Sequence, residues 1–203
     1  MTEIVVDWDG TVTEQDTLSL ALQHFVPRKI LEPITARVDA ALAAGTMSLR
    51  EVMECEFGSM KMPLADVVAF VVEKARIRSG FAELVARFDP LILSTSFHET
   101  IEPVLEREGL TVRVRASRAV AGPNGWSIRW ISDFDCSQCG EACKRSALPA
   151  APFIYIGDGY SDRCAALAAD RVFARDGLAR YLTELGAAYV PYDDFYDVLA
   201  ALS

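Results

Sequence analysis

Two carboxylates lie two residues apart just after the first apolar segment of the chain, in the stretch IVVDWDGTVT (residues 4–13). At the end of a buried strand, Asp7 and Asp9 would repel each other, so another group must offset their charge. Alternate side chains of a strand share a face, so both carboxylates are expected to face one site while Trp8 points into packing. Carboxylates placed in this way can act as nucleophile, acid, base or metal ligand.

Further polar residues follow two later apolar segments in the same manner. They are Ser94, Thr95 and Ser96 at the end of the second predicted strand, Asp158 and Asp162 after the fourth, and Lys144 shortly before the fourth. Ligand sites of open α/β sheets form at the carboxyl ends of the strands. These side chains therefore converge on one edge of the sheet if the strands that carry them are neighbours.

Such a group of acids is not stable as bare charge, because carboxylates a few ångströms apart repel by roughly several kcal/mol. A divalent cation removes the conflict, and hard oxygen ligands predict Mg²⁺. Lys144 and Ser94 would then suit the negative charge of a phosphoryl group. A nucleophile, an acid and surrounding cations are the parts that phosphoryl transfer needs.

The elements that would position these residues alternate between short apolar strands and helices. The predicted strands cover residues 4–9, 90–95, 111–117, 152–158, 171–174 and 187–191, and the predicted helices cover 98–108, 160–169, 176–186 and 193–202. Apolar strands separated by helices indicate an α/β fold, a Rossmann-like parallel sheet with helices on both faces. Residues 119–130 place Pro-Asn-Gly between two apolar runs, which predicts a small β-hairpin.

A long helical pattern interrupts this alternation between about Asp16 and Gly80. It exceeds what one crossover helix requires, so it predicts a separate helical subdomain inserted above the sheet. The predicted domains are therefore a core of residues 1–15 and 81–203 and a helical cap of residues 16–80.

The chain is acidic, with 20 Lys and Arg against 29 Asp and Glu, a net charge of −9. This charge argues against nucleic acid or an anionic membrane as the main partner, and it leaves a small phosphorylated ligand possible. The N-terminus resembles no signal peptide and no apolar run is long enough to span a bilayer, so a cytoplasmic protein is expected. The sequence does not decide between a monomer and a homodimer.

Three of the five cysteines, Cys136, Cys139 and Cys143, are clustered just before Lys144. They could supply three of the four ligands of a zinc site. No fourth ligand is evident, because Cys164 lies too close to the predicted helix 160–169 to be assigned. Packed, reduced thiols are the preferred interpretation of the cluster.

In order and spacing, DWDGT (7–11), Ser94, Lys144 and GDGYSD (157–162) resemble the four motifs of the haloacid dehalogenase superfamily. The helical insertion resembles the C1-type cap of that superfamily. The chain is more similar to the phosphoserine-phosphatase-like members, and among these to the 2-hydroxy-3-keto-5-methylthiopentenyl-1-phosphate phosphatases. The segments that carry this closer resemblance are KARIRSGF (74–81), CSQCGEACK (136–144), FARD (173–176) and PYDDFYDV (191–198).

The resemblance implies a Mg²⁺-dependent phosphomonoesterase that acts on a small phosphorylated metabolite through an aspartyl-phosphate. Asp162 would either ligate the metal through water or orient the lysine. The other implied roles are Asp7 as nucleophile, Asp9 as acid and base, Lys144 as the neutralising cation, Ser94 and Thr95 as phosphate ligands, and Asp7, the Asp9 carbonyl and Asp158 as Mg²⁺ ligands.

Three departures from the family pattern bear on the substrate. Thr95 and Ser96 replace the Gly-Gly that usually follows the motif serine. Asp16 stands where phosphoserine phosphatases place a Glu that meets the substrate's amino group, although it could equally cap the first cap helix. Cys55 falls at the position of the cap Arg that reads the phosphoserine carboxylate, which weakens a phosphoserine assignment.

Two other functions remain open at this stage. The same scaffold could pass the phosphoryl group to a sugar, as a phosphotransferase or mutase. It could also be a catalytically silent protein that binds a phosphate ligand, although every chemical position is filled. The identity of the phosphorylated substrate is not given by the sequence.

Overall fold

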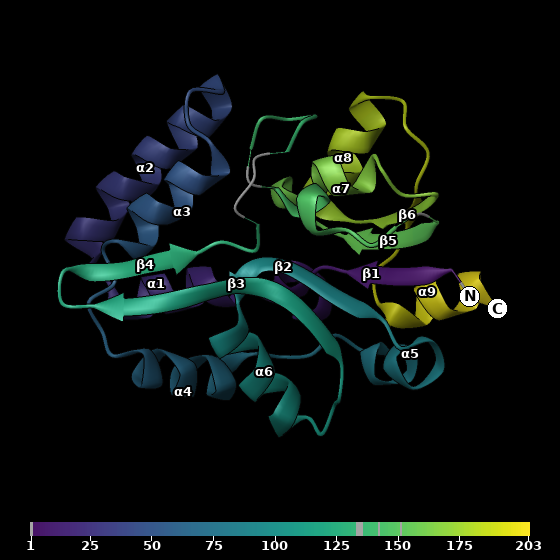
Figure 1. Cartoon of the computed structure of the whole chain (residues 1–203), viewed down its shortest axis with the longest axis horizontal. Helices are drawn as coiled ribbons and strands as arrows, with labels where there is room; N and C mark the ends of the chain where they lie inside the picture. Colours follow the sequence, from purple (N-terminus) through teal and green to yellow (C-terminus); the bar gives the residue numbers. More distant parts are fainter. Residues whose placement is uncertain (1, 133–135, 142, 151) are drawn as a thin grey trace.

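The centre of the molecule is a seven-stranded sheet with the order β4-β3-β2-β1-β5-β6-β7 (Figure 1). The computed structural model describes residues 2–132, 136–141, 143–150 and 152–203, without the side chain of residue 43. Neighbouring strands are parallel except β3 and β4, so the predicted parallel sheet is confirmed. The strands are β1 (Glu3–Val6), β2 (Leu91–Phe97), β3 (Arg113–Gly122), β4 (Gly125–Arg129), β5 (Phe153–Gly157), β6 (Arg171–Ala174) and β7 (Val190–Pro191).

Helices connect most of these strands. They are α1 (Thr17–Phe25), α2 (Arg28–Ala44), α3 (Leu49–Phe57), α4 (Leu64–Lys74), α5 (Phe81–Phe88), α6 (His98–Arg107), α7 (Arg163–Ala166), α8 (Asp176–Glu184) and α9 (Phe195–Leu202). Local sequence signals explain several helix starts, such as the reciprocal capping box of Ser48 and Glu51 at α3. No helix in the described part of the chain has the length and apolar character to cross a membrane.

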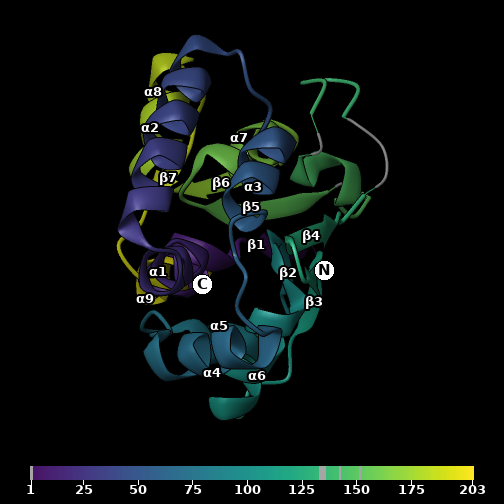
Figure 2. The ribbon, with the colours of Figure 1, turned by 90° about the vertical axis from the view of Figure 1, so that its left-hand side faces the viewer.

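Both faces of the sheet are covered, as the uninterrupted apolar strands predict. In β1, Ile4 and Val6 belong to a core that includes residues of α5, α6 and α9, whereas Val5 belongs to a second core with residues of α7 and α8. Figures 1 and 2 show α4, α5 and α6 on one side of the sheet and α7 and α8 on the other. The central strand is thus held from both sides, which fixes the position of the residues that follow it.

Strand β1 ends earlier than predicted, because the chain turns immediately after Asp7. The Asp7 N–H still donates to the Ile156 carbonyl at 2.9 Å, and the Thr13 N–H then closes a π-type turn on the Trp8 carbonyl at 3.0 Å. Gly10 has a φ of 75°, which an extended strand cannot contain. The prediction of a strand through residue 9 was therefore wrong, but Trp8 is fully buried as predicted.

Other element boundaries also differ from the sequence predictions. The hairpin is confirmed, but its first arm continues the preceding strand without a break, so residues 113–122 form the single strand β3. The predicted helix 160–169 is a 3₁₀ turn (Tyr160–Asp162) followed by the short α7. Helix α5 was not predicted, and its eight residues pack against α9, where the ring of Phe81 contacts that of Phe195.

Helices α1 to α4 lie between β1 and β2 in the chain, and the two connections to them run side by side. Thr13 forms an isolated antiparallel bridge with Ile77. The guanidinium of Arg78 donates to the carbonyls of Gly10 at 2.8 Å and Thr11 at 2.9 Å. We call residues 13–14 and 76–78 the linker pair. The assignment of residues 16–80 as a cap domain stays a prediction.

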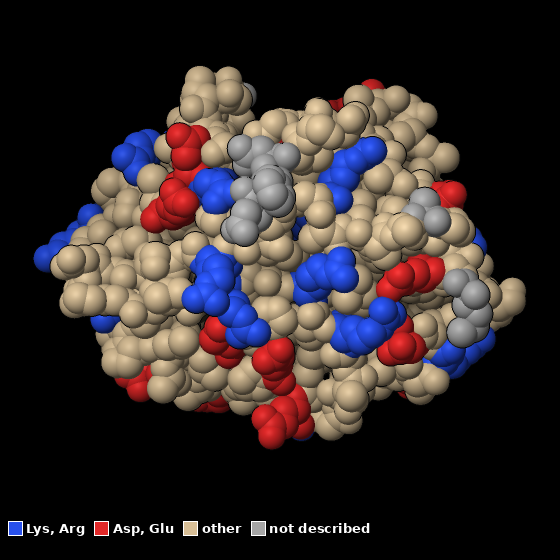
Figure 3. Space-filling model, viewed as in Figure 1, with Lys and Arg blue, Asp and Glu red and all other residues tan. Residues whose placement is uncertain are grey.

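The sheet face formed by β3 and β4 carries several arginines that pair with acids. Arg113 contacts Glu3 at 2.9 Å and Arg118 contacts Glu99 at 3.1 Å. Figure 3 shows this face, with blue and red side chains next to one another at several places. Acids therefore compensate the charge of Arg113 and Arg118.

An aromatic cluster joins α3 to the hairpin and to β2. The ring of Phe57 meets that of Phe97 edge-on at 5.0 Å and lies nearly parallel to that of Trp126 at 6.3 Å. All three side chains are buried. Pairs of this geometry stabilise a fold beyond the apolar area that they bury.

We predict that Phe57→Ala lowers the free energy of unfolding by about 3–5 kcal/mol, since it opens a cavity among packed rings. Urea unfolding followed by circular dichroism measures the change. Leu185→Ala, at a side chain that is 54% exposed, serves as the control and should change it by less than about 0.5 kcal/mol. Equal effects of the two substitutions would contradict the conclusion that the aromatic cluster holds α3 against the hairpin and β2.

Candidate active site

A cavity of about 240 Å³ lies at the carboxyl ends of β1, β2 and β5. Because β1 lies between β2 and β5, the residues after all three strands meet there, as the sequence predicts. The core contributes Asp7, Asp9, Ser94, Thr95, Ser96, Asp158, Gly159, Tyr160 and Ser161, and the inserted helices contribute Asp16, Leu18, Ser19, Leu22, Leu49, Val52, Met53, Glu56 and Phe57.

Lys144 connects two of the predicted acids. Its fully buried ammonium forms ion pairs with Asp7 and, at 2.6 Å, with Asp162. Burial, followed by the charge of Asp162, raises the pKa of Asp7 well above its usual value. Burial would lower the pKa of Lys144, but the two carboxylates outweigh it and the pKa lies above the usual value. The lysine is therefore charged and fixed between the two acids.

Both carboxylate oxygens of Asp162 accept hydrogen bonds. Besides the lysine, Oδ1 accepts the Tyr155 hydroxyl at 2.7 Å, and Oδ2 accepts the N–H groups of Asp158 and Gly159, each at 2.9 Å. Burial would raise the pKa of Asp162, but Lys144 and these donors lower it below its usual value. Tyr155 was not identified from the sequence, where it looked like an ordinary strand residue.

The carboxylates of Asp7, Asp158 and Asp162 are close enough to share a cation, with one oxygen of each lying within 4.8 Å of the others. Burial, and then the charge of Asp162, raises the pKa of Asp158 to about 6. The Thr11 hydroxyl donates to Asp158 Oδ1 at 2.8 Å. Burial first, and then the neighbouring charge of Asp162, disfavours the ionised forms of Asp7 and Asp158 among these hard oxygen donors. This donor set fits a divalent cation.

Asp9 also lines the cavity and is tied to the first inserted helix. Its Oδ1 accepts the Thr17 N–H at 2.7 Å and the Thr17 hydroxyl at 2.6 Å. Burial, and then the charge of Asp16, raises the pKa of Asp9 to about 7. Thr17 is the first residue of α1, so its contact with Asp9 depends on how the helix is placed and cannot be identified from the sequence pattern.

The segment Ser94-Thr95-Ser96 brings its backbone and side chains to the cavity. The register between β2 and β3 shifts between Ser94 and Phe97, so the segment bulges out of the regular ladder. Ser94 is buried, and its hydroxyl accepts the Ser96 N–H at 3.0 Å. Thr95 and Ser96 place side chains where glycines would leave open space.

Asp16 and Cys55, the two cap positions singled out in the sequence, have different surroundings. Asp16 lines the cavity, and its side chain also caps α1 by accepting the Ser19 N–H at 2.8 Å. A contact of Asp16 with substrate stays a prediction. Cys55 is not among the residues that line the cavity, and its Sγ accepts a hydrogen bond from Arg37 at 3.0 Å.

The wall formed by α1 and α3 combines apolar side chains with acids, and its described residues include no cation. None of the described residues that line the cavity is a lysine or arginine. Glu56 was not identified from the sequence, because helical spacing alone does not show which face meets the cavity. Burial, and then the charges of Asp16 and Asp39, raises the pKa of Glu56 to about 7.

We predict that Glu56→Gln raises the free energy of unfolding at pH 8 by about 1–2 kcal/mol, a figure reduced for the water that still reaches this side chain. Because the pKa of Glu56 is raised in the folded state, its protonated form contributes its full stabilisation below pH 4.5. This contribution is lost as the pH rises through 7. The substitution should therefore have little effect at pH 5. Urea unfolding at both pH values measures this, and an equal change at pH 5 and pH 8 would contradict it.

Comparison with known proteins agrees with this geometry. The family model of haloacid dehalogenase-like hydrolases matches residues 4–167. A 2-hydroxy-3-keto-5-methylthiopentenyl-1-phosphate phosphatase from Microcystis aeruginosa is 32% identical over 98% of this chain and 96% of its own.

Two solved structures share the fold at low sequence identity. A phosphoserine phosphohydrolase-like protein from Francisella tularensis has a TM-score of 0.69 at 19% identity, with 100% of both chains covered. A phospho-aspartyl intermediate analogue of phosphoserine phosphatase has a TM-score of 0.71 at 14% identity, with 99% of both chains covered. The match to the family model and the 32% identity to the Microcystis phosphatase show that the chain belongs to the haloacid dehalogenase-like hydrolases.

Proposed function

We propose that the protein is a Mg²⁺-dependent phosphomonoesterase that hydrolyses a small phosphorylated metabolite through an aspartyl-phosphate on Asp7. The observation that carries this proposal is the buried Lys144, held between Asp7 and Asp162 beside a cavity that Asp9 also lines. The proposed nucleophile, a fixed cation and a titratable acid thus lie together at or beside one cavity. Phosphoryl transfer requires these three kinds of group.

Asp7 is the proposed nucleophile. Its Oδ1 is held by Lys144 and by the Trp8 N–H, which donates at 2.6 Å. Oδ2 is therefore the oxygen that would attack phosphorus, forming the O–P bond as the bond to the leaving oxygen breaks. Lys144 stays charged and offsets the negative charge that gathers on the nucleophile and the phosphoryl group.

Asp9 is the proposed acid and base. Its pKa of about 7 lets both protonation states exist near neutral pH, which suits a group that first donates and then accepts a proton. The protonated form would give its proton to the leaving oxygen. The carboxylate would then take a proton from the water that hydrolyses the aspartyl-phosphate.

Asp7, Asp158 and the Asp9 carbonyl would hold Mg²⁺, and the bound ion would neutralise charge on the phosphoryl oxygens. Asp162 would act by orienting Lys144, since both of its oxygens already accept hydrogen bonds. Ser94 and Thr95, which also line the cavity, would bind phosphate oxygens.

The leaving group is proposed to be an uncharged alcohol or enol with an apolar part. A carboxylate, such as that of phosphoserine, would meet Asp16 and Glu56 without an opposing cation among the described lining residues. Apolar contacts are available from Leu22, Val52 and Met53. The name of the Microcystis relative describes a phosphate ester with a methylthio group, which has this chemistry.

We also propose that residues 16–80 act as a cap over a core of residues 1–15 and 81–203. Helices α1 and α3 supply the wall of the cavity that faces the strand ends. A cap in this position would exclude water from the reacting groups and select the leaving group.

We predict that Asp7→Asn lowers the rate of phosphate release by at least about 10³-fold with Mg²⁺ present, because the amide cannot form the aspartyl-phosphate. Phosphate release from a chromogenic ester measures the rate. Asp66→Asn, at an exposed acid of α4, is the matched control and should keep full activity. Unchanged turnover in Asp7→Asn would exclude the proposed mechanism.

We further predict that kcat/KM for 2-hydroxy-3-keto-5-methylthiopentenyl-1-phosphate exceeds that for phosphoserine by at least about 100-fold, a difference of about 2.7 kcal/mol in transition-state binding. Free phosphate should be the product of both reactions. A preference for phosphoserine would show that the cavity binds a carboxylate after all. Transfer of the phosphoryl group to a sugar would instead indicate a phosphotransferase.

A further inference from the structure

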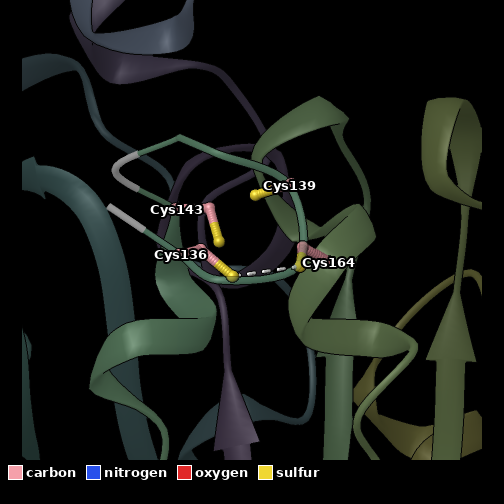
Figure 4. A group of neighbouring side chains, drawn as sticks. All are labelled: Cys136, Cys139, Cys143 and Cys164. Atoms are coloured by element: carbon pink, nitrogen blue, oxygen red, sulfur yellow. Dashed lines mark hydrogen bonds between the residues drawn. The ribbon is translucent and has the colours of Figure 1, made fainter. Parts of the chain in front are cut away.

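We propose that Cys136, Cys139, Cys143 and Cys164 bind one zinc ion as a tetrathiolate site, separate from the carboxylate cavity. The four Sγ atoms all lie within 4.8 Å of one another, and those of Cys136 and Cys164 are 3.6 Å apart. Sulfurs at about 2.3 Å from a tetrahedral zinc are about 3.8 Å from each other. Figure 4 shows three of the side chains coming from one loop and Cys164 from α7, with the sulfurs turned toward a common centre.

Cys164 corrects the expectation that the cluster has no fourth ligand. In the sequence it is 21 residues beyond Cys143 and two residues after the motif that carries Asp162. The folded chain brings the start of α7 against the loop, where the Cys164 carbonyl accepts a hydrogen bond from Arg145 at 3.3 Å. Three sulfurs from a loop and one from a helix complete the set of four that a closed zinc site needs.

The loop backbone is folded around the sulfur of Cys136. The Gln138 N–H donates to Cys136 Sγ at 3.4 Å, and the Gly140 N–H donates to the Cys136 carbonyl at 2.8 Å. Gly140 has a φ of 72°, so the chain reverses directly after Cys139. Donors aimed at sulfur favour the thiolate form, which is the form that binds metal.

Few of the described side chains in this loop are buried. Among the described residues from 130 to 143, only Cys136 and Cys143 are buried. Cys139 is exposed, which leaves one side of the cluster accessible to an incoming ion. A loop without an apolar core of its own is the setting in which a structural metal supplies the missing stability.

The cluster also adjoins the charged pair of the active site. Lys144 directly follows Cys143, and Asp162 lies two residues before Cys164. A bound zinc would therefore join the loop that carries the lysine to the helix start that carries its acid. We infer that the ion positions Lys144 without contacting substrate.

The two sites differ in the metal that their ligands prefer. Zinc binding displaces the four thiol protons and changes no oxidation state. Thiolates select zinc, whereas the carboxylate oxygens suit Mg²⁺. The proposal stands whether or not the chain hydrolyses phosphate esters, because it rests on sulfurs outside the cavity.

The test begins with the metal content of the full chain, purified without chelator under reducing conditions and measured by mass spectrometry. One zinc per chain is expected in the wild type and in the control Cys55→Ser, which removes the cysteine outside the cluster. Cys139→Ser should weaken zinc binding at least about tenfold, measured by competition with a chromogenic chelator. Its side chain is exposed, so this substitution leaves the packing of the chain intact.

Cobalt gives a second measurement that does not depend on any variant. Titration of the metal-free wild-type chain with Co²⁺ should produce intense thiolate-to-cobalt absorption, which oxygen ligands do not give. Asp158→Asn should keep that absorption while losing phosphate release, which distinguishes this site from the proposed function. Absence of both zinc and the thiolate absorption would overturn the proposal, as would a disulfide between Cys136 and Cys164 in the freshly purified chain.

Discussion

The charge balance around Lys144 is the constraint on which the rest of the site depends. A fully buried ammonium is strongly disfavoured unless carboxylates surround it, and a buried carboxylate has the same requirement in reverse. Asp7 and Asp162 meet this condition from the segments that follow β1 and β5, and these two strands are neighbours in the sheet. One ammonium cannot neutralise all of the acids, and burial together with the charge of Asp162 raises the pKa values of Asp7 and Asp158.

Two glycines allow the acids to come this close to the backbone. A Cβ at Gly10 would lie 2.4 Å from Asp158 Oδ2, and one at Gly157 would lie 2.6 Å from Asp162 Oδ2. Neither contact is possible with a side chain in place. The glycines of these motifs are therefore as necessary to the charge arrangement as the carboxylates, because they leave room for the acids beside the backbone.

The sequence was sufficient to predict the sheet and most of the acids in the site, because strand ends meet at one edge once neighbouring strands are parallel. It could not predict contacts that depend on how separate elements are placed. Thr17 reaches Asp9 only because α1 starts beside it, and Glu56 faces the cavity only because of the rotation of α3. The position of Cys164 beside the loop cysteines likewise depends on the packing of α7. The long strand β3 was divided in the prediction because its exposed arginines interrupt the apolar pattern.

The linker pair has a consequence for how this molecule can change over evolution. The chain leaves the core at Thr13 and returns at Ile77, and these two residues are bridged to each other. The intervening segment thus begins and ends at one point, a condition under which insertions are well tolerated. Its length and sequence can diverge while the strand order and the acids beneath stay unaltered. In the proposed assignment, the reacting acids and the residues that select the leaving group lie in segments of the chain that can change independently.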